Sequence, residues 1–181
     1  TRRSSDLIMS ESSVVDSFDA IVINECSGRL EFDNVSFRYE GSDEYALSGI
    51  SFTANPGETT AIIGSTGSGK STIVNLIPRF FDVTAGCIRL DGRDIRDISM
   101  KSLRDQIGLV PQKGILFSGT IDSNIRFGNE AATPEEVREA AEIAQALEFI
   151  EEKEDKFESV IAQGGSNVSG GQKQRISIAR A

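Results

Sequence analysis

One segment constrains this chain more than any other. It reads Gly64, Ser65, Thr66, Gly67, Ser68, Gly69, Lys70 and Ser71, which is the G-x-x-x-x-G-K-S spacing of a Walker A phosphate-binding loop. Small residues let the backbone curl around a phosphate with its N–H groups pointing inward. The lysine ammonium would reach the β and γ phosphates, and the serine hydroxyl would face Mg²⁺. The segment therefore predicts a nucleoside triphosphate site between a strand and a helix.

The neighbours of this loop fit that layout. Residues 59–63 form a short β-branched run, which predicts a buried strand. Apolar residues at helical spacing from Ile73 to Ile77 predict a helix that ends before Pro78. A dinucleotide-binding G-x-G-x-x-G loop would need glycine where the chain has Thr72, so that alternative is disfavoured.

The rest of the first half alternates like β strands. Apolar residues alternate over 30–39, and a change of phase at Asp33-Asn34 predicts a bulge or turn there. A second β stretch covers 47–52, and residues 87–92 are typical of a strand that enters a turn. Residues 107–110 are expected to form another strand.

The second half has helical character. Thr133 is expected to be a helix N-cap, with Pro134 in the first turn and Glu136 three residues on. Apolar residues from Val137 to Leu147 share one helical face. Strands, a P-loop βα unit and a helical insert, in that order, predict an α/β nucleotide-binding layout.

A second glycine-rich helix start lies near the end of the sequence. Ser169, Gly170, Gly171 and Gln172 have capping-box spacing, with the serine as N-cap and the glutamine as its partner. The N–H groups of such a start suit an anion. Alone, the segment fits an ordinary capped helix equally well, and it is the Walker A loop that favours an anion site.

The composition excludes several chemistries. The 181 residues include no His, which removes a Ser-His-Asp triad, a His-ligated zinc site and a His general base. Asp and Glu number 28 against 19 Lys and Arg, and this net charge of −9 argues against nucleic-acid binding through a broad basic face. Cys26 and Cys87 are far apart and form no C-x-x-C motif, so they predict neither a disulfide framework nor a metal site.

Together these motifs resemble the ATP-binding cassette (ABC) ATPases, specifically the nucleotide-binding domain of an exporter-type transporter. Residues 169–172 look like the signature motif, and 109–112 look like the Q-loop. Residues 37–39 look like the strand that carries the A-loop aromatic, and 117–125 like the exporter segment after the Q-loop. The resemblance implies an α/β fold: a P-loop NTPase core of ABC ATPase type with an antiparallel β subdomain and an α-helical insert subdomain, C-terminally incomplete.

The resemblance also implies roles for single residues, with ATP and Mg²⁺ as ligands. Lys70 and Gln112 would be catalytic, and Ser71 and Gln112 would contact Mg²⁺. Tyr39 would stack on adenine. The Walker A residues and Thr72 would hold the phosphates.

The implied partners lie outside this chain. Residues 169–172 would bind ATP held by a second cassette, so that a homodimer or heterodimer sandwiches two ATP molecules head to tail. Residues 1–27 look like the linker from a preceding transmembrane domain, and 28–181 like the nucleotide-binding domain. We expect no nucleic-acid partner. The expected place is the cytoplasmic face of the cell membrane, where MgATP hydrolysis would be coupled to export.

The end of the sequence departs from the family pattern. The chain stops at Ala181, inside the helix after the signature, whereas the family's Walker B strand, catalytic Glu, D-loop and switch His lie further on. We therefore expect a fragment that binds ATP weakly and does not turn it over alone, with Ile62 and Ile63 losing packing against a central strand. Two alternatives stay open: a regulatory or degenerate cassette of a heterodimeric transporter, and a non-transport ABC ATPase.

Overall fold

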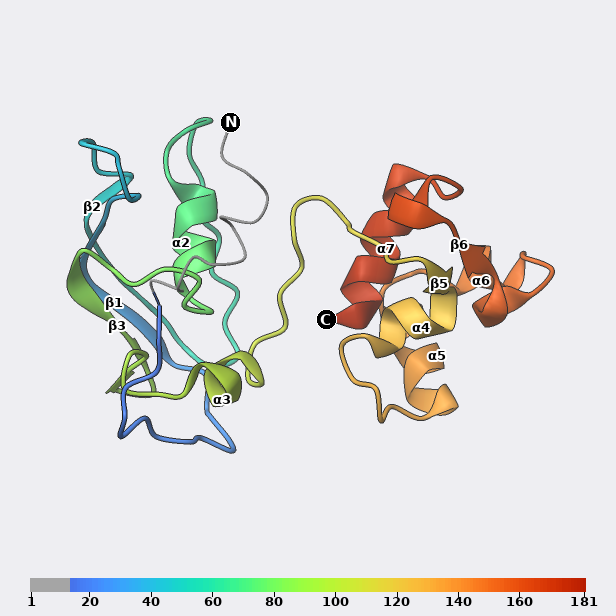
Figure 1. Cartoon of the computed structure of the whole chain (residues 1–181), viewed down its shortest axis with the longest axis horizontal. Coiled ribbons are helices and arrows are strands. Elements are labelled where there is room, and N and C mark those ends of the chain that lie inside the picture. Colours follow the sequence, from blue (N-terminus) through green and yellow to red (C-terminus); the bar gives the residue numbers. More distant parts are fainter. Residues whose placement is uncertain (1–13) are drawn as a thin grey trace, which may run out of the picture. The chain divides into compact units, whose positions relative to one another are not determined.

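The computed structural model describes residues 14–181, which fall into two compact units (Figure 1). Unit 1 extends to Ile107, and unit 2 is Gly108–Ala181. The elements of unit 1 are β1 (Leu30–Phe37), β2 (Leu47–Ala54), α2 (Lys70–Leu76), β3 (Ala85–Leu90), β4 (Arg93–Asp94) and α3 (Met100–Arg104). Those of unit 2 are β5 (Gly119–Thr120), α4 (Ile121–Arg126), α5 (Pro134–Ile143), α6 (Leu147–Glu151), η1 (Lys156–Glu158), β6 (Val160–Ile161), η2 (Gln163–Gly165) and α7 (Gly170–Arg180).

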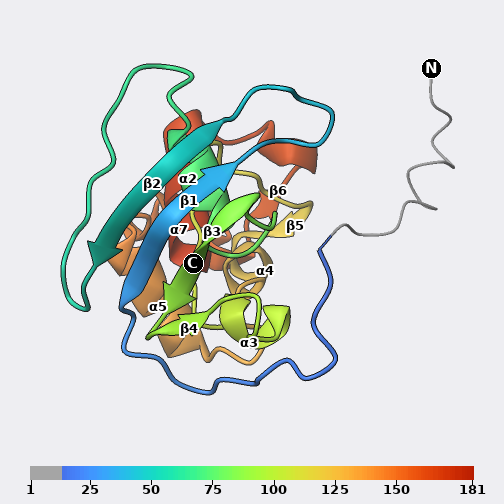
Figure 2. The same ribbon diagram turned by 90° about the vertical axis from the view of Figure 1, so that its left-hand side faces the viewer.

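The sheet of unit 1 is the antiparallel β subdomain that the resemblance implies. Its strand order is β2-β1-β3-β4, and every neighbouring pair is antiparallel (Figure 2). Phe32 of β1 lies opposite Phe52 of β2 and Ile88 of β3. The β1–β2 register shifts between Phe32 and Val35, and Asn34 there has a φ of 48°. The predicted bulge is therefore confirmed.

The core of unit 1 lies between this sheet and α2. Val35 and Leu76 are fully buried, and the Phe32 and Phe52 rings stack with their centroids 4.5 Å apart. The other buried apolar residues of this core are Phe37, Leu47, Ile73, Ile88, Leu90, Ile95, Ile98 and Leu103. Alternation along β1 supplies Phe32, Val35 and Phe37, and helical spacing along α2 supplies Ile73 and Leu76, as the sequence predicted.

Two predicted strands do not form. Residues 59–63 are irregular, and the Ile63 side chain is 92% exposed. Residues 107–110 are irregular as well. Both segments lack a neighbouring strand. A β-strand needs a hydrogen-bonded partner at its side, and neither segment pairs with any strand in the described part of the chain.

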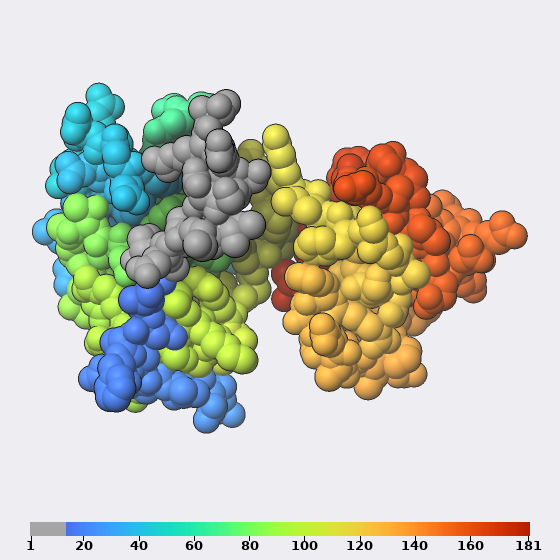
Figure 3. Space-filling view, in the orientation of Figure 1, coloured from blue at the N-terminus to red at the C-terminus, as the bar shows by residue number. Residues whose placement is uncertain are grey.

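The described part of the predicted linker, residues 14–27, is called the lead-in below and is hydrogen-bonded to the body of unit 1. Ile21 donates to Asp97 O at 2.8 Å and accepts from Ser99 N at 2.9 Å. The buried Arg79 donates to Val15 O at 3.0 Å. In the space-filling view the lead-in, in blue, lies against the yellow-green α3 region (Figure 3). Residues 1–13 of the predicted linker lie outside the described residues.

Unit 2 is the predicted helical part. Thr133 caps α5 by accepting from Glu136 N, and the Glu136 side chain bonds back to Thr133 N at 2.7 Å, so the predicted capping box is confirmed. Helix α7 packs against α4 and α5. The buried residues of this core are Leu116, Ile121, Ile125, Val137, Ala141, Ala144, Ala146, Phe149, Ile150, Ile161, Ile176 and Ala179.

The Asp91 carboxylate ties the lead-in to the β3–β4 turn. It accepts from Ser27 N at 2.7 Å, from Ser27 Oγ at 2.5 Å and from Arg29 N at 2.9 Å. These hydrogen bonds, chiefly the one from the Ser27 hydroxyl, lower the pKa of Asp91 below its ordinary value, against an opposing effect of burial. We predict that Asp91→Asn, which tolerates the φ of 50° at this position, lowers the free energy of unfolding at pH 7 by about 1 kcal/mol.

The pH dependence of this effect has a defined sign. Because folding lowers the pKa of Asp91, its stabilisation is complete above the ordinary aspartate pKa of about 4 and is lost as the pH falls through the folded-state pKa. Urea unfolding of wild type and variant should therefore differ at pH 7 and converge in acid. The control is Asp97→Asn, because Asp97 is exposed and holds Ile21 through its main chain. An equal loss from both variants would contradict the proposed role of the Asp91 side chain.

Candidate nucleotide-binding site

The Walker A loop of unit 1 runs as an irregular turn from Gly64 into α2, which begins at Lys70. Gly69, the residue before the helix, has a left-handed φ of 86°, and its carbonyl accepts from Ile73 N at 3.0 Å. Helix α2 ends at Leu76, so the helix predicted to stop before Pro78 is confirmed.

The Lys70 side chain folds back into this loop. Its Nζ donates to Gly64 O at 2.9 Å and to Ser65 O at 2.6 Å, and lies 3.4 Å from Ser68 Oγ. All three acceptors are neutral. Because a phosphate oxygen carries a full negative charge, it attracts the ammonium more strongly than a neutral carbonyl or hydroxyl does, and a phosphate can displace them. The ammonium is thus already held where an anion would enter the loop.

Two glycines of the loop are required by close approaches. A Cβ on Gly69 would lie 2.6 Å from Leu47 Cδ2 and 2.8 Å from Ala46 O, at the start of β2. A Cβ on Gly64 would lie 2.5 Å from Ser68 Oγ. The loop therefore packs directly against the sheet, and its curvature leaves no room for side chains at these positions.

Tyr39 shares a hollow with this loop. It lies two residues beyond the end of β1, and its side chain is 39% exposed. The hollow, of about 270 Å³, is lined by Tyr39, Ala46 and residues 67–72. The structure thus brings together the predicted base-stacking residue and the predicted phosphate loop of unit 1.

Two contacts of Tyr39 were not found from the sequence. Its hydroxyl lies 3.1 Å from Thr72 Oγ1, and its ring meets the Phe81 ring edge-on, with centroids 5.4 Å apart. Phe81 follows α2 in an irregular segment where neither a motif nor a periodicity points to it. No sequence pattern predicts a contact between Thr72 and Tyr39, which lies 33 positions earlier in the chain.

The signature residues of unit 2 form the start of α7. Ser169 caps the helix by accepting from Gln172 N at 3.2 Å, and the Gln172 side chain accepts from Ser169 N at 3.0 Å. This confirms the predicted capping box. Gly170 and Gly171 are exposed, and a Cβ on either would meet nothing within 4 Å. Their surface is open to a ligand.

The predicted Q-loop residue lies in the same unit, next to α7. Gln112 is exposed in an irregular segment. On one side of it, Pro111 O accepts from Gln174 Nε2 at 3.4 Å. On the other side, a Cβ on Gly114 would lie 2.8 Å from the Lys173 carbonyl. The Gln112 segment therefore follows the first turns of the signature helix.

Within unit 1 the magnesium prediction depends on Ser71, because Gln112, the other predicted contact, lies in unit 2. In residues 14–181 no group of three or more acidic, Cys or His residues could hold a metal ion by itself. Mg²⁺ at a triphosphate site needs only one or two protein oxygens, because substrate phosphates and waters fill the other positions. The Ser71 hydroxyl is exposed in the first turn of α2, beside the loop, so the donor set of unit 1 fits an ion carried by a nucleotide.

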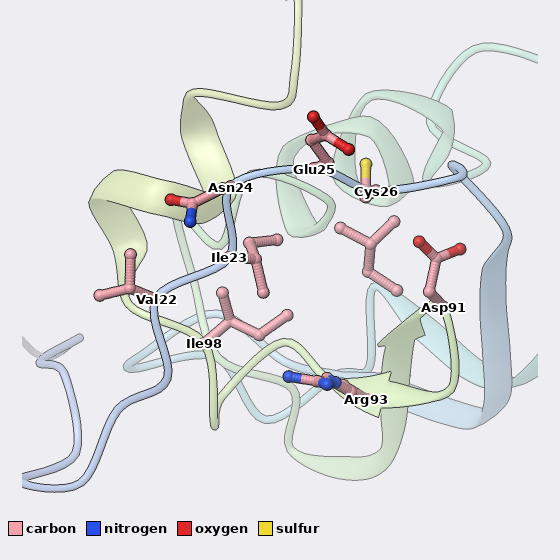
Figure 4. A pocket seen from close by; sticks show the side chains of 9 residues that line it. Val22, Ile23, Asn24, Glu25, Cys26, Asp91, Arg93 and Ile98 are labelled. Carbon is pink, nitrogen blue, oxygen red and sulfur yellow. The ribbon is translucent and has the colours of Figure 1, made fainter.

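A second hollow of unit 1 contains none of the predicted residues. It has a volume of about 350 Å³ and lies between lead-in residues 22–26 and the β3–β4 turn (Figure 4). Ile23 and Ile98 lie close to each other on one side of it, and Asp91 and Arg93 lie on the other. It is separate from the candidate site.

The close approach of Gly69 to the sheet yields a stability prediction. We expect Gly69→Ala to lower the free energy of unfolding by about 2–4 kcal/mol, because the methyl group adds an overlap with Ala46 O to the cost of a positive φ. Gly67→Ala is the matched control: its φ is 83°, but a Cβ there meets nothing within 4 Å. It should cost only about 1 kcal/mol. Urea unfolding of the three proteins measures the difference, and equal losses would rule out the packing argument.

Known proteins share both the sequence and this geometry. The family described as "ABC transporter" matches residues 47–181. A β-(1→2)glucan export ATP-binding/permease protein of Rhodopseudomonas palustris is 51% identical over 168 residues, which are 93% of this chain and 28% of that protein. An ATP-dependent lipid A-core flippase of Chromobacterium violaceum is 51% identical over 154 residues, 85% of this chain and 26% of that protein.

The fold is also similar to that of a solved structure. A bacterial Atm1-family ABC exporter with ATP bound has a TM-score of 0.89 and 39% identity, and the match covers 97% of this chain and 31% of that one. The chain thus spans less than a third of the length of these relatives. The family match over residues 47–181 includes both the Walker A loop and the signature helix. The chain belongs to the ABC transporter family.

Proposed function

We propose that unit 1 binds MgATP and that, in the whole protein, this chain is the ATP-hydrolysing domain of an exporter. One observation carries the proposal: the Lys70 ammonium is enclosed by the Walker A loop in the same hollow that Tyr39 borders. A cation for phosphates and an aromatic ring for a base are thus placed within one site. Membership of the ABC transporter family supports ATP as the nucleotide.

The roles within unit 1 follow from position and chemistry. Lys70 would exchange its carbonyl acceptors for β and γ phosphate oxygens, and the loop N–H groups would bind the same phosphates. Ser71 and the triphosphate would hold Mg²⁺, which neutralises charge on the phosphates. Tyr39 would stack on adenine, and Thr72 would lie at the α2 end of the phosphates.

The roles within unit 2 involve a second molecule. Residues 169–172 would bind the γ phosphate of ATP held by another cassette, since Gly170 and Gly171 leave the start of α7 open. Gln112 would contact Mg²⁺ and the attacking water. We therefore propose a head-to-tail dimer of cassettes as the hydrolytic state.

Transport would need a membrane domain. The Rhodopseudomonas and Chromobacterium relatives are named as an export permease and a flippase, and both are much longer than this chain. No helix within residues 14–181 is long and apolar enough to cross a bilayer. We propose that the whole protein joins this chain to a transmembrane domain and that the nucleotide site faces the cytoplasm.

Removal of the Lys70 ammonium tests the nucleotide site. Lys70→Ala should weaken MgATP binding about 10- to 100-fold, because charged hydrogen bonds to the phosphates are lost. Isothermal titration calorimetry suits the measurement, since the chain has no Trp. Lys101→Ala is the control: Lys101 is an exposed lysine of unit 1 that pairs with Asp105 at 2.6 Å. If the wild-type protein binds no MgATP, or if Lys70→Ala binds it as well as wild type does, the proposed site is wrong.

A further inference from the structure

One hydrogen bond joins the predicted base site to the helix that follows the phosphate loop. The Tyr39 hydroxyl lies 3.1 Å from Thr72 Oγ1. Tyr39 belongs to the segment after β1, whereas Thr72 lies in the first turn of α2 and is only 7% exposed. A buried hydroxyl on a helix is a fixed anchor, so the bond ties the movable end of Tyr39 to a rigid element.

The Tyr39 ring has two further fixed contacts. It meets Phe37 at an interplanar angle of 83°, with centroids 4.8 Å apart, and Phe81 at 85°, with centroids 5.4 Å apart. Edge-to-face packing of this kind is the favoured arrangement of aromatic pairs. Phe37 is in β1 and Phe81 follows α2, so the ring is held from three directions once Thr72 is counted.

We propose that Thr72 is a positioning residue for base recognition: its hydroxyl fixes the Tyr39 ring in the orientation that stacks on the nucleotide base. This inference rests on the proposed function. The χ2 torsion of tyrosine is broad, so packing alone restricts the ring less than packing combined with an anchored hydroxyl does. A ring that is ordered before binding spares the ligand that ordering cost.

The position of Thr72 gives this anchor a consequence. Thr72 follows Ser71 directly and lines the hollow that Tyr39 borders. The part of the ATP affinity that comes from stacking on the base therefore depends on the Thr72 side chain, which lies in the helix turn after the phosphate loop. A ligand that has phosphates but no base does not stack on the Tyr39 ring, and any phosphate contact of Thr72 itself is shared by ligands with and without a base.

The first experiment compares MgATP with magnesium tripolyphosphate by calorimetry. Tyr39→Phe keeps the ring and removes only the hydroxyl. We expect it to weaken MgATP binding about three- to tenfold, the range for one hydrogen bond, and to leave tripolyphosphate binding unchanged. The ratio of the two dissociation constants is the readout, because a general loss of stability would lower both affinities.

The second experiment removes the other end of the bond. Thr72→Val should lower the ATP preference over tripolyphosphate by the same factor as Tyr39→Phe, and Thr72→Ser, which keeps a hydroxyl, should restore it. The double variant with Thr72→Val and Tyr39→Phe should show no further loss of preference, because both changes break one bond. Each variant deletes the bond independently, so a folding defect in one leaves the other informative.

Tyr45→Phe is the matched control. Tyr45 is the only other tyrosine of the sequence, is 53% exposed and lies under the Arg38 guanidinium rather than at the loop. It should change neither affinity. If Tyr39→Phe leaves the preference unchanged, or if its effect adds to that of Thr72→Val, this inference is overturned while nucleotide binding stands. If wild type binds neither ligand, the proposed function fails, and this inference fails with it.

Discussion

The Lys70 ammonium holds the Walker A loop in its curled form. Three neutral oxygens of the loop, two carbonyls and one hydroxyl, surround a single cation. These oxygens would repel one another without the charge, so the ammonium adds to the stabilisation that the loop gains from packing against the sheet. The arrangement also prepares the site for its ligand, because an anion that enters the loop replaces weaker acceptors with stronger ones. In the proposed site, the same charge would thus stabilise the loop and recognise the phosphate.

The sheet decides where this loop sits. Gly69 packs against Ala46 and Leu47 at the start of β2, and Tyr39 follows β1, the neighbour of β2. The pairing of β1 with β2 therefore sets the distance between the aromatic ring and the loop. A bulge at Asn34 lies on the same strand, between the core residues Phe32 and Val35. Sheet register, rather than the loop sequence alone, brings the predicted base-stacking residue and the predicted phosphate loop to one hollow.

Local signals could be read from the sequence. The caps at Thr133 and Ser169, the end of α2 before Pro78 and the bulge near Asn34 each depend on residues a few positions apart. Family resemblance supplied the antiparallel pairing of the sheet, which local patterns cannot assemble.

Non-local contacts could not be read in this way. Residues 59–63 have the composition of a buried strand, yet Ile63 is 92% exposed, because burial depends on a lateral neighbour and not on β propensity. The hydrogen bond between Tyr39 and Thr72 spans 33 residues, and Tyr39 lies outside any helix or strand. Phe81 packs on the same ring without a motif to mark it. Such contacts are products of the fold, and no periodicity encodes them.

In unit 2 the packing of α7 joins two motifs that the sequence separates. The Gln112 segment lies along this helix because Gly114 leaves room for the Lys173 carbonyl. Lys173 in turn donates from Nζ to Gly164 O at 2.9 Å, in the turn before the signature residues. A shift of α7 would therefore move both its own glycine-rich start and the segment that carries Gln112. In the proposed dimer, a ligand at Gly170 and Gly171 would thus act on Gln112 through direct packing within one compact unit.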